Sequence, residues 1–154
     1  MNSVHGTCVA FGRFGVLFRG PSGSGKSSLA LCLIDAEGFG IGQRKLKARL
    51  VADDQVVLQQ KGSTILASPP NSLSGKLEIR GLGIVILDYL RQVEIRLVVD
   101  LVPPNSIARM PDSADTEVDL LGATLPRLAL DGQMADAPAK LRAAVVHLKR
   151  NKAI

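Results

Sequence analysis

The sequence predicts a mixed α/β domain with a phosphate-binding loop at one edge of its central sheet. An apolar run, Phe14–Gly20, leads into the glycine-rich stretch GPSGSGKS, and a helix-like run, Ser27–Glu37, follows it. A second apolar run, Leu50–Asp54, ends in two carboxylates, and a third, Glu94–Val102, is rich in Val, Ile and Leu. Strand, glycine loop and helix in this order are the setting in which the pattern Gly-x-x-x-x-Gly-Lys-Ser binds phosphate.

The length and composition favour one globular domain, residues 1–154. The chain has 154 residues, of which 46% are hydrophobic and 21% are charged, so it can bury a core. No apolar run approaches the roughly 18 residues that a membrane span requires. The N-terminus has no basic segment before an apolar one, as a secretory signal would have. These features predict a cytoplasmic protein with no membrane partner.

The charge and the cysteines limit the classes of partner. The net charge of +5 suits phosphate groups or an acidic protein equally well. Aromatic residues make up only 3% of the chain, so no base-stacking surface and no nucleic-acid partner are expected. The two cysteines, Cys8 and Cys32, are too few for a disulfide framework or a zinc site. Cys32 lies among aliphatic residues and is expected to be buried.

The first half of the chain divides into short elements. His5–Gly20 is expected to form two strands that turn at Gly12–Arg13, the second of which delivers the chain to the glycine loop. The first helix begins near Lys26 and ends by Gly38, because glycine favours a helix end. The basic, glycine-containing segment Phe39–Arg49 is expected to be a mobile loop.

The second half alternates hairpin signals with irregular segments. Gln55–Pro70 has the pattern of a hairpin. The three glycines of Leu73–Leu87 indicate irregular backbone or a close approach to a ligand. Pro103–Pro126 is the least periodic segment, and a strand is expected near Leu125–Leu130. The final helix is expected to start near Asp136 and places cations in its last turn.

The glycine loop predicts how a nucleotide is held. Its backbone N–H groups surround a phosphate, and its glycines permit the close approach. Lys26 supplies a cation to the β- and γ-phosphates of a nucleotide, and the Ser27 hydroxyl supplies an oxygen to Mg²⁺. The residues expected to bind the nucleotide are Gly20, Pro21, Ser22, Gly23, Ser24, Gly25, Lys26 and Ser27.

The carboxylates of Asp53 and Asp54 follow the second apolar strand. Successive side chains of a regular strand point to opposite faces, so these two carboxylates are not expected to share one proton. One would face the metal and phosphates, and the other would have a supporting role. Acidic pairs at strand ends also occur as solvated turns, but the glycine loop upstream favours a functional pair here.

Four stretches in this order resemble the HPr(Ser) kinase/phosphorylase family: HGTCVAF, GPSGSGKS, RLVADDQV and LEIRGLGIVIL. LEIRGLGI is the most specific, because generic P-loop kinases lack it. The resemblance covers residues 5–110 well and corresponds to the catalytic C-terminal domain of the family, as in its short forms. It implies a P-loop kinase fold with a mixed central sheet, related to phosphoenolpyruvate carboxykinase, and a hexamer.

The resemblance also implies a reaction and its residues. ATP would phosphorylate a serine of the phosphocarrier protein HPr, which regulates the phosphotransferase system, and phosphorolysis would reverse the step. Asp54 becomes the proton acceptor, with His5 as its partner. Carried over by motif, the catalytic residues are His5, Lys26, Asp54 and Arg109, the metal ligands are Ser27 and Glu78, and the supporting residues are Asp53 and Arg80.

Some of these assignments have alternatives. Glu78 and Arg80 share one face of an extended segment, where they would serve metal and phosphate or form a local ion pair. His5 is otherwise an ordinary histidine at a strand start. The extra segment GIGQRKLKAR, absent from the family pattern, either meets an acidic partner or is a solvated loop. The family's phosphorolysis segment has only Arg127 in a comparable place, so the kinase direction is favoured.

Two other functions remain compatible with the glycine loop. A small-molecule kinase of the P-loop class would share the loop, but the sequence has no evident lid with paired arginines and this function does not explain LEIRGLGI. A nucleotide-dependent sensor would bind a partner without transferring phosphate. The intact set of Lys26, Ser27, Asp54 and Glu78 favours an enzyme.

Overall fold

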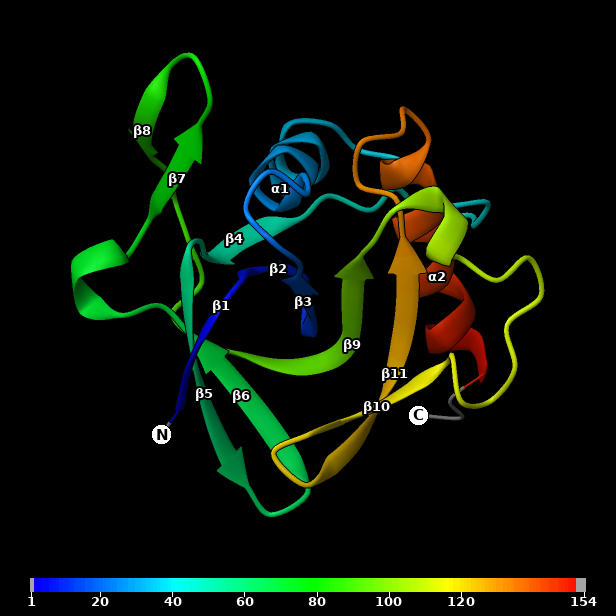
Figure 1. Cartoon of the computed structure of the whole chain (residues 1–154). Coiled ribbons are helices and arrows are strands. Elements are labelled where there is room, and N and C mark those ends of the chain that lie inside the picture. The colour runs from blue at the N-terminus through cyan, green and yellow to red at the C-terminus, as the bar shows by residue number, and fades with distance from the viewer. Residues whose placement is uncertain (1, 152–154) are drawn as a thin grey trace.

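A curled mixed sheet organises the computed structural model, which describes residues 2–151 (Figure 1). Its main path runs β1-β5-β6-β9-β3-β2-β4, and β11 joins β9 with β10 at its side. A separate two-stranded sheet, β7-β8, projects from the body beside α1 (Figure 1). The elements are β1 (Asn2–His5), β2 (Thr7–Phe11), β3 (Phe14–Arg19), α1 (Lys26–Asp35), β4 (Arg49–Ala52), β5 (Gln55–Lys61), β6 (Thr64–Ser68), β7 (Lys76–Ile79), β8 (Gly83–Ile86), β9 (Val93–Leu101), β10 (Glu117–Leu120), β11 (Ala123–Leu130) and α2 (Ala137–Asn151), with short 3-10 turns at η1 (Asn71–Leu73) and η2 (Pro104–Ser106).

The sheet buries apolar side chains on both faces. Strand alternation sends Val9 and Phe18 toward α1 and α2, where they pack with Leu33 and Leu141 in one cluster. The neighbouring residues of the same strands, among them Leu17, enter a second cluster enclosed by the curl of the sheet. Strands β2 and β3 are therefore apolar at almost every position, as expected for strands that are covered on both sides.

Parallel pairing brings three strand ends to one edge of the sheet. β9 pairs in parallel with β3 on one side and with β11 on the other, and Asp100 is in register with both Arg19 and Ala129. The loops that follow β3 and β11 therefore leave the sheet at the same edge. In open α/β sheets this carboxyl edge is where ligands bind.

Most predicted elements are confirmed. β2 and β3 form the antiparallel pair that turns at Gly12–Arg13, and β5 and β6 form the second hairpin. β9 is the buried strand predicted at Glu94–Val102. α1 begins at Lys26 and ends three residues before Gly38, and α2 begins one residue after Asp136.

In Leu73–Leu87 the glycines Gly75, Gly81 and Gly83 have φ values of 73°, 89° and 107°, which confirms irregular backbone at these positions within a hairpin, β7-β8. Three expectations are wrong. The chain before Gly6 forms a separate strand, β1, which pairs with β5 rather than continuing β2. Pro103–Pro126 contains a strand, β10, that was not predicted. Cys32 is exposed, since the apolar face of α1 is centred on Leu29 and Leu33.

The segment Phe39–Arg49 has no helix, and its strand pairing is limited to an isolated bridge between Leu46 and Gly38 and to the start of β4. Its glycines pack closely on α2, where a Cβ on Gly40 would meet the backbone of Arg142. The mobility of this segment stays a prediction. Among residues 2–151, neither helix has the length and apolar content needed to cross a bilayer.

Candidate active site

A polar pocket of about 410 Å³ lies where the glycine loop meets the ends of β1, β4 and β7. Its lining combines hydroxyl, carboxylate and cationic groups. Of the predicted site residues, Gly20, Pro21, Ser24 and Arg109 do not line it. The lining residues are His5, Thr7, Ser22, Gly23, Gly25, Lys26, Ser27, Ser28, Asp53, Asp54, Glu78, Arg80 and Gln133.

The glycine loop delivers backbone donors to this pocket. Gly23 and Gly25 have φ values of 82° and 100°, which side chains disfavour, so glycine is required for this turn. The first helical hydrogen bond of α1 runs from Leu29 N to Gly25 O at 2.8 Å. The N–H groups of Lys26, Ser27 and Ser28 precede it and lie outside the helical pattern. Together with the helix dipole, these donors favour an anion at this position.

Lys26 lies within the loop, and its side chain is mostly buried. Its Nζ donates hydrogen bonds to the carbonyl oxygens of Gly20 and Pro21 at 2.7 and 3.0 Å. Burial lowers the pKa of Lys26, while the nearby charges of Asp53 and Asp54 raise it in part. The two acceptors that hold the lysine are uncharged carbonyl oxygens. A charged phosphate oxygen accepts a stronger hydrogen bond from an ammonium group and can replace them.

Asp53 is the centre of the hydrogen-bond network. Its side chain is buried, and its Oδ1 accepts hydrogen bonds from the hydroxyls of Thr7 and Ser27, both at 2.8 Å. Its Oδ2 accepts a hydrogen bond from the backbone N–H of Glu78 at 3.2 Å. This one carboxylate therefore connects β2, the start of α1 and β7, a larger role than the supporting one that the sequence predicted.

Asp54 has the opposite environment. Its backbone has a φ of 70°, uncommon for a residue other than glycine but tolerated by aspartate, and its side chain is 66% exposed. Nδ1 of His5 donates a hydrogen bond to the Asp54 carbonyl oxygen at 3.0 Å and lies 3.7 Å from Oδ1. The two neighbouring carboxylates thus differ in burial, but not as the opposite faces of a regular strand that the sequence predicted. β4 ends at Ala52, the backbone turns at Asp54, and both carboxylates line the same pocket.

Glu78 and Arg80 lie at the rim that β7 contributes. Both line the pocket, and within residues 2–151 they form no ion pair with each other. The local ion-pair alternative is therefore not supported. The segment stays extended through Glu78 because Leu77 beneath it is fully buried in a strand that packs on α1.

The prediction from sequence missed Gln133, which follows β11. Its Nε2 donates a hydrogen bond to the Gly23 carbonyl oxygen at 2.6 Å, and the adjacent Gly132 lies against Gly25. A Cβ on Gly132 would be 2.8 Å from the Ser24 carbonyl oxygen, so the two backbones require glycine here. Only the parallel pairing of β3, β9 and β11 places this turn beside the glycine loop.

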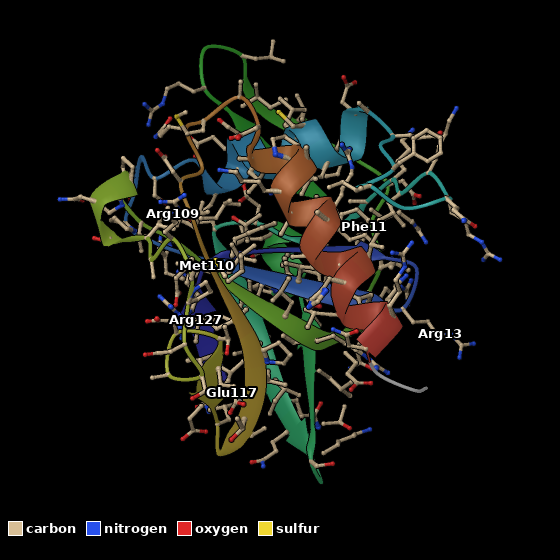
Figure 2. All side chains as sticks on the ribbon, turned by 90° about the vertical axis from the view of Figure 1, so that its right-hand side faces the viewer. Phe11, Arg13, Arg109, Met110, Glu117 and Arg127 are labelled. Carbon is tan, nitrogen blue, oxygen red and sulfur yellow. The ribbon has the colours of Figure 1, made fainter. Side chains whose placement is uncertain are left out.

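Arg109 lies in the exposed loop after η2. Figure 2 shows Arg109 and Arg127 on the same side of α2, across the helix from Phe11 and Arg13. Arg127 donates a hydrogen bond to Asp100 at 2.6 Å, and Arg19 donates two to the same carboxylate. Arg127 is thus held in an ion-pair cluster outside the pocket, and the catalytic role of Arg109 stays a prediction.

The donor set fits Mg²⁺ as a partner of phosphates rather than as an ion in an all-protein cage. Among the described residues no three His, Cys, Asp or Glu side chains converge on one point. Magnesium bound with nucleotides takes one or two protein oxygens and completes its shell with phosphates and water. The Ser27 hydroxyl and the Glu78 carboxylate supply oxygens of the required kind, and Asp53 accepts hydrogen bonds from the Ser27 hydroxyl and the Glu78 backbone N–H.

The fold and the pocket together define a mixed α/β domain with a polar pocket, built around a glycine loop, at the carboxyl edge of a parallel strand pair. The chain belongs to the HPr serine kinase C-terminal domain family, whose sequence model matches residues 1–152. A solved structure, the Hpr(Ser) kinase/phosphatase from Coxiella burnetii, has the same fold. It superposes with a TM-score of 0.76 at 25% identity and covers 97% of each chain.

Curated relatives named HPr kinase/phosphorylase agree. The protein from Lactobacillus acidophilus is 39% identical over 66% of this chain. Those from Chlorobium chlorochromatii and Streptococcus thermophilus are 38% and 32% identical over 77% and 83% of it. The matched regions are 31%, 33% and 41% of the three relatives, so this chain spans about a third of their length.

Proposed function

We propose that this chain transfers phosphate from ATP to a serine of an HPr-like protein, using a P-loop kinase fold. The observation that carries the proposal is that two adjacent carboxylates differ in burial and in hydrogen bonding. Asp53 is buried and fixes Ser27 at the start of α1, while Asp54 faces the pocket beside the same loop. A pocket with one fixed and one available carboxylate suits transfer to a hydroxyl, which needs both a bound nucleotide and a proton acceptor.

The loop and its neighbours would hold the nucleotide. Lys26 would exchange its two carbonyl partners for phosphate oxygens, and the N–H groups at the start of α1 would bind the same phosphates. Ser27 and Glu78 would hold Mg²⁺, with Asp53 orienting the Ser27 hydroxyl. When bound, the ion neutralises charge on the phosphates.

Asp54 would take the proton of the attacking serine. A serine hydroxyl is a poor nucleophile, and a carboxylate placed at the pocket can accept its proton as the oxygen attacks. His5 would position Asp54 through the backbone, because its Nδ1 bonds the Asp54 carbonyl oxygen more closely than the carboxylate. By microscopic reversibility, the same residue in its protonated form would serve phosphorolysis.

The relatives and the structural neighbour carry names that include HPr, which supports HPr as the substrate here. The hexamer, the relation to phosphoenolpyruvate carboxykinase, the phosphorolysis direction and the cytoplasmic location stay predictions. Incubation of the chain with γ-labelled ATP, Mg²⁺ and purified HPr, followed by phosphosite mapping, tests the proposal. Labelling of one serine is the expected result; ATP binding without any labelled serine would instead indicate a sensor.

A further inference from the structure

The hairpin formed by β7 and β8 presents large aliphatic side chains to solvent. Leu82, Ile84 and Ile86 are 70%, 66% and 71% exposed. Single exposed aliphatic residues are common, but three at alternate positions of one strand and its turn form a contiguous surface. In Figure 1 the hairpin projects beside α1, and β8 is its outer strand.

The register of the hairpin places this surface on the same face as the pocket residues. Residues directly opposite in an antiparallel pair share a face, and Glu78 is opposite Ile84 while Lys76 is opposite Ile86. The other face carries Leu77, which is fully buried. The outward face therefore runs without interruption from the carboxylate at the pocket rim to the exposed isoleucines.

We propose that this face, the hairpin surface of Lys76, Glu78, Leu82, Ile84 and Ile86, is the docking surface for the protein substrate. The proposal rests on the proposed function and extends it, since it assigns where the rest of the substrate binds. A folded protein that places a serine beside Asp54 must cover the pocket rim, which the hairpin forms through Glu78 and Arg80. A protein that covers this rim would also contact Ile84 and Ile86, which lie on the same face of the hairpin.

The chemistry of the surface specifies the matching surface of the substrate. The isoleucines favour an apolar patch next to the phosphorylated serine. Lys76 and Arg80, on the same side of the hairpin, favour carboxylates around that patch. A free small-molecule substrate in the pocket would not reach Lys76, Ile84 or Ile86, which lie outside its lining, so the hairpin surface also favours a protein over a metabolite.

The test replaces Ile84 and Ile86 together by threonine, which keeps the β-branched shape and strand preference but removes apolar surface. We expect the KM for HPr to rise by roughly tenfold or more, the scale of losing central apolar contacts. The KM for ATP should not change, because neither residue lines the pocket. Ile41→Ser is the comparison variant, since Ile41 is 90% exposed and lies on the loop after α1, outside the hairpin. It should raise the KM for HPr less than the double variant does and leave the KM for ATP unchanged.

Three results would overturn the assignment. An unchanged KM for HPr in the double variant would show that the substrate does not use this surface. An equal loss in Ile41→Ser would show a general effect of surface polarity. An assembly that dissociates only in the double variant, measured by sedimentation velocity, would identify a second copy of the chain as the occupant. A wild-type chain that labels no serine would instead refute the proposed function itself, and the docking partner with it.

Discussion

The Ser27 hydroxyl donates a hydrogen bond of 2.8 Å to Oδ1 of the buried Asp53 carboxylate. This bond links the strand that ends in two carboxylates to the first turn of α1. It fixes the hydroxyl at the mouth of the glycine loop before any ligand binds there, and a preorganised group loses less entropy on binding.

Asp53→Asn is therefore expected to weaken Mg²⁺–nucleotide binding by roughly tenfold to a hundredfold, the usual effect of losing a residue that orients a metal ligand. The amide can still accept hydrogen bonds from Thr7 and Ser27, but it carries no charge. Calorimetric titration of Mg²⁺-ATP into both proteins measures the change. Equal affinities would remove Asp53 from the nucleotide site.

Glu78→Gln keeps the size of the side chain and removes its charge. If Glu78 helps to hold Mg²⁺, transfer should require a higher Mg²⁺ concentration, while the hydrogen bond from its backbone N–H to Asp53 remains. The measurement is the rate of transfer to HPr as a function of Mg²⁺ concentration. A titration curve that coincides with that of the wild type would place Glu78 outside the metal site.

Gln133→Glu tests the contact that sequence analysis missed. The substitution replaces the Nε2 donor, 2.6 Å from the Gly23 carbonyl oxygen, by an acceptor that carries negative charge. The variant should bind ATP about tenfold more weakly, because the new carboxylate repels the negatively charged phosphates and the loop loses a hydrogen bond. Gln133→Ala, which removes the contact without adding charge, should have a smaller effect. The account fails here if ATP affinity is the same in all three proteins.

The ion pairs of Asp100 are expected to make the free energy of unfolding depend on pH in the acidic range. Burial alone would raise the pKa of Asp100, but the hydrogen bonds and charges of Arg19 and Arg127 outweigh it and lower that pKa. A carboxylate whose pKa is lower in the folded state contributes stability that is complete above its unfolded pKa of about 3.9 and is lost as pH falls through the folded value. The free energy of unfolding should therefore rise with pH across that acidic window.

Asp100→Asn should remove this part of the acid dependence. It should also lower the free energy of unfolding at neutral pH by roughly 2–3 kcal/mol, because Arg19 and Arg127 lose their shared carboxylate. The loss is limited because both arginines are partly exposed and can be hydrated. Denaturant unfolding at several pH values measures it. The matched control is Asp88→Asn, because the ion pair of Asp88 with Arg49 is 3.0 Å long but the Asp88 side chain is 88% exposed. Such a pair contributes about 0–1 kcal/mol. Equal effects of the two substitutions would contradict the assignment.

The glycine loop was predictable because its conformation depends on local chemistry. Glycines permit the turn, and the apolar runs on each side specify a strand and a helix. Cys32 was placed wrongly because its neighbours in the chain, Leu31, Leu33 and Ile34, are apolar. The helical period gives the right answer, since Ser28 and Asp35 share the face of Cys32 and are polar and exposed. The β7-β8 hairpin was missed because exposed Ile84 and Ile86 hide the usual alternation of a strand.

Contacts between distant segments lay beyond prediction from one sequence. Gln133 reaches the glycine loop only because β11 pairs in parallel with β9, and no local pattern specifies that partner. The three hydrogen bonds to Asp53 come from three elements, so its central role depends on the fold. The different environments of Asp53 and Asp54 do not follow from strand alternation either, because β4 ends at Ala52, Asp54 has a φ of 70°, and both carboxylates line the same pocket.

The central claim is that Asp54 accepts the serine proton. Asp54→Asn should leave the fold and ATP affinity nearly unchanged, because Lys26 and the loop supply the phosphate contacts. Transfer to HPr should fall by about two to four orders of magnitude, the scale of losing general-base catalysis. His5→Ala should cause a smaller loss, since His5 acts by positioning Asp54.

The most direct measurement is the single-turnover rate of serine labelling on HPr by Asp54→Asn, made with ATP at saturating concentration so that binding does not limit it. The account predicts a rate lower than that of the wild type by a hundredfold or more, on the order expected for a missing base, with the ATP dissociation constant preserved in the same preparation. A labelling rate equal to that of the wild type would contradict the account and transfer the role of base to another residue of the pocket.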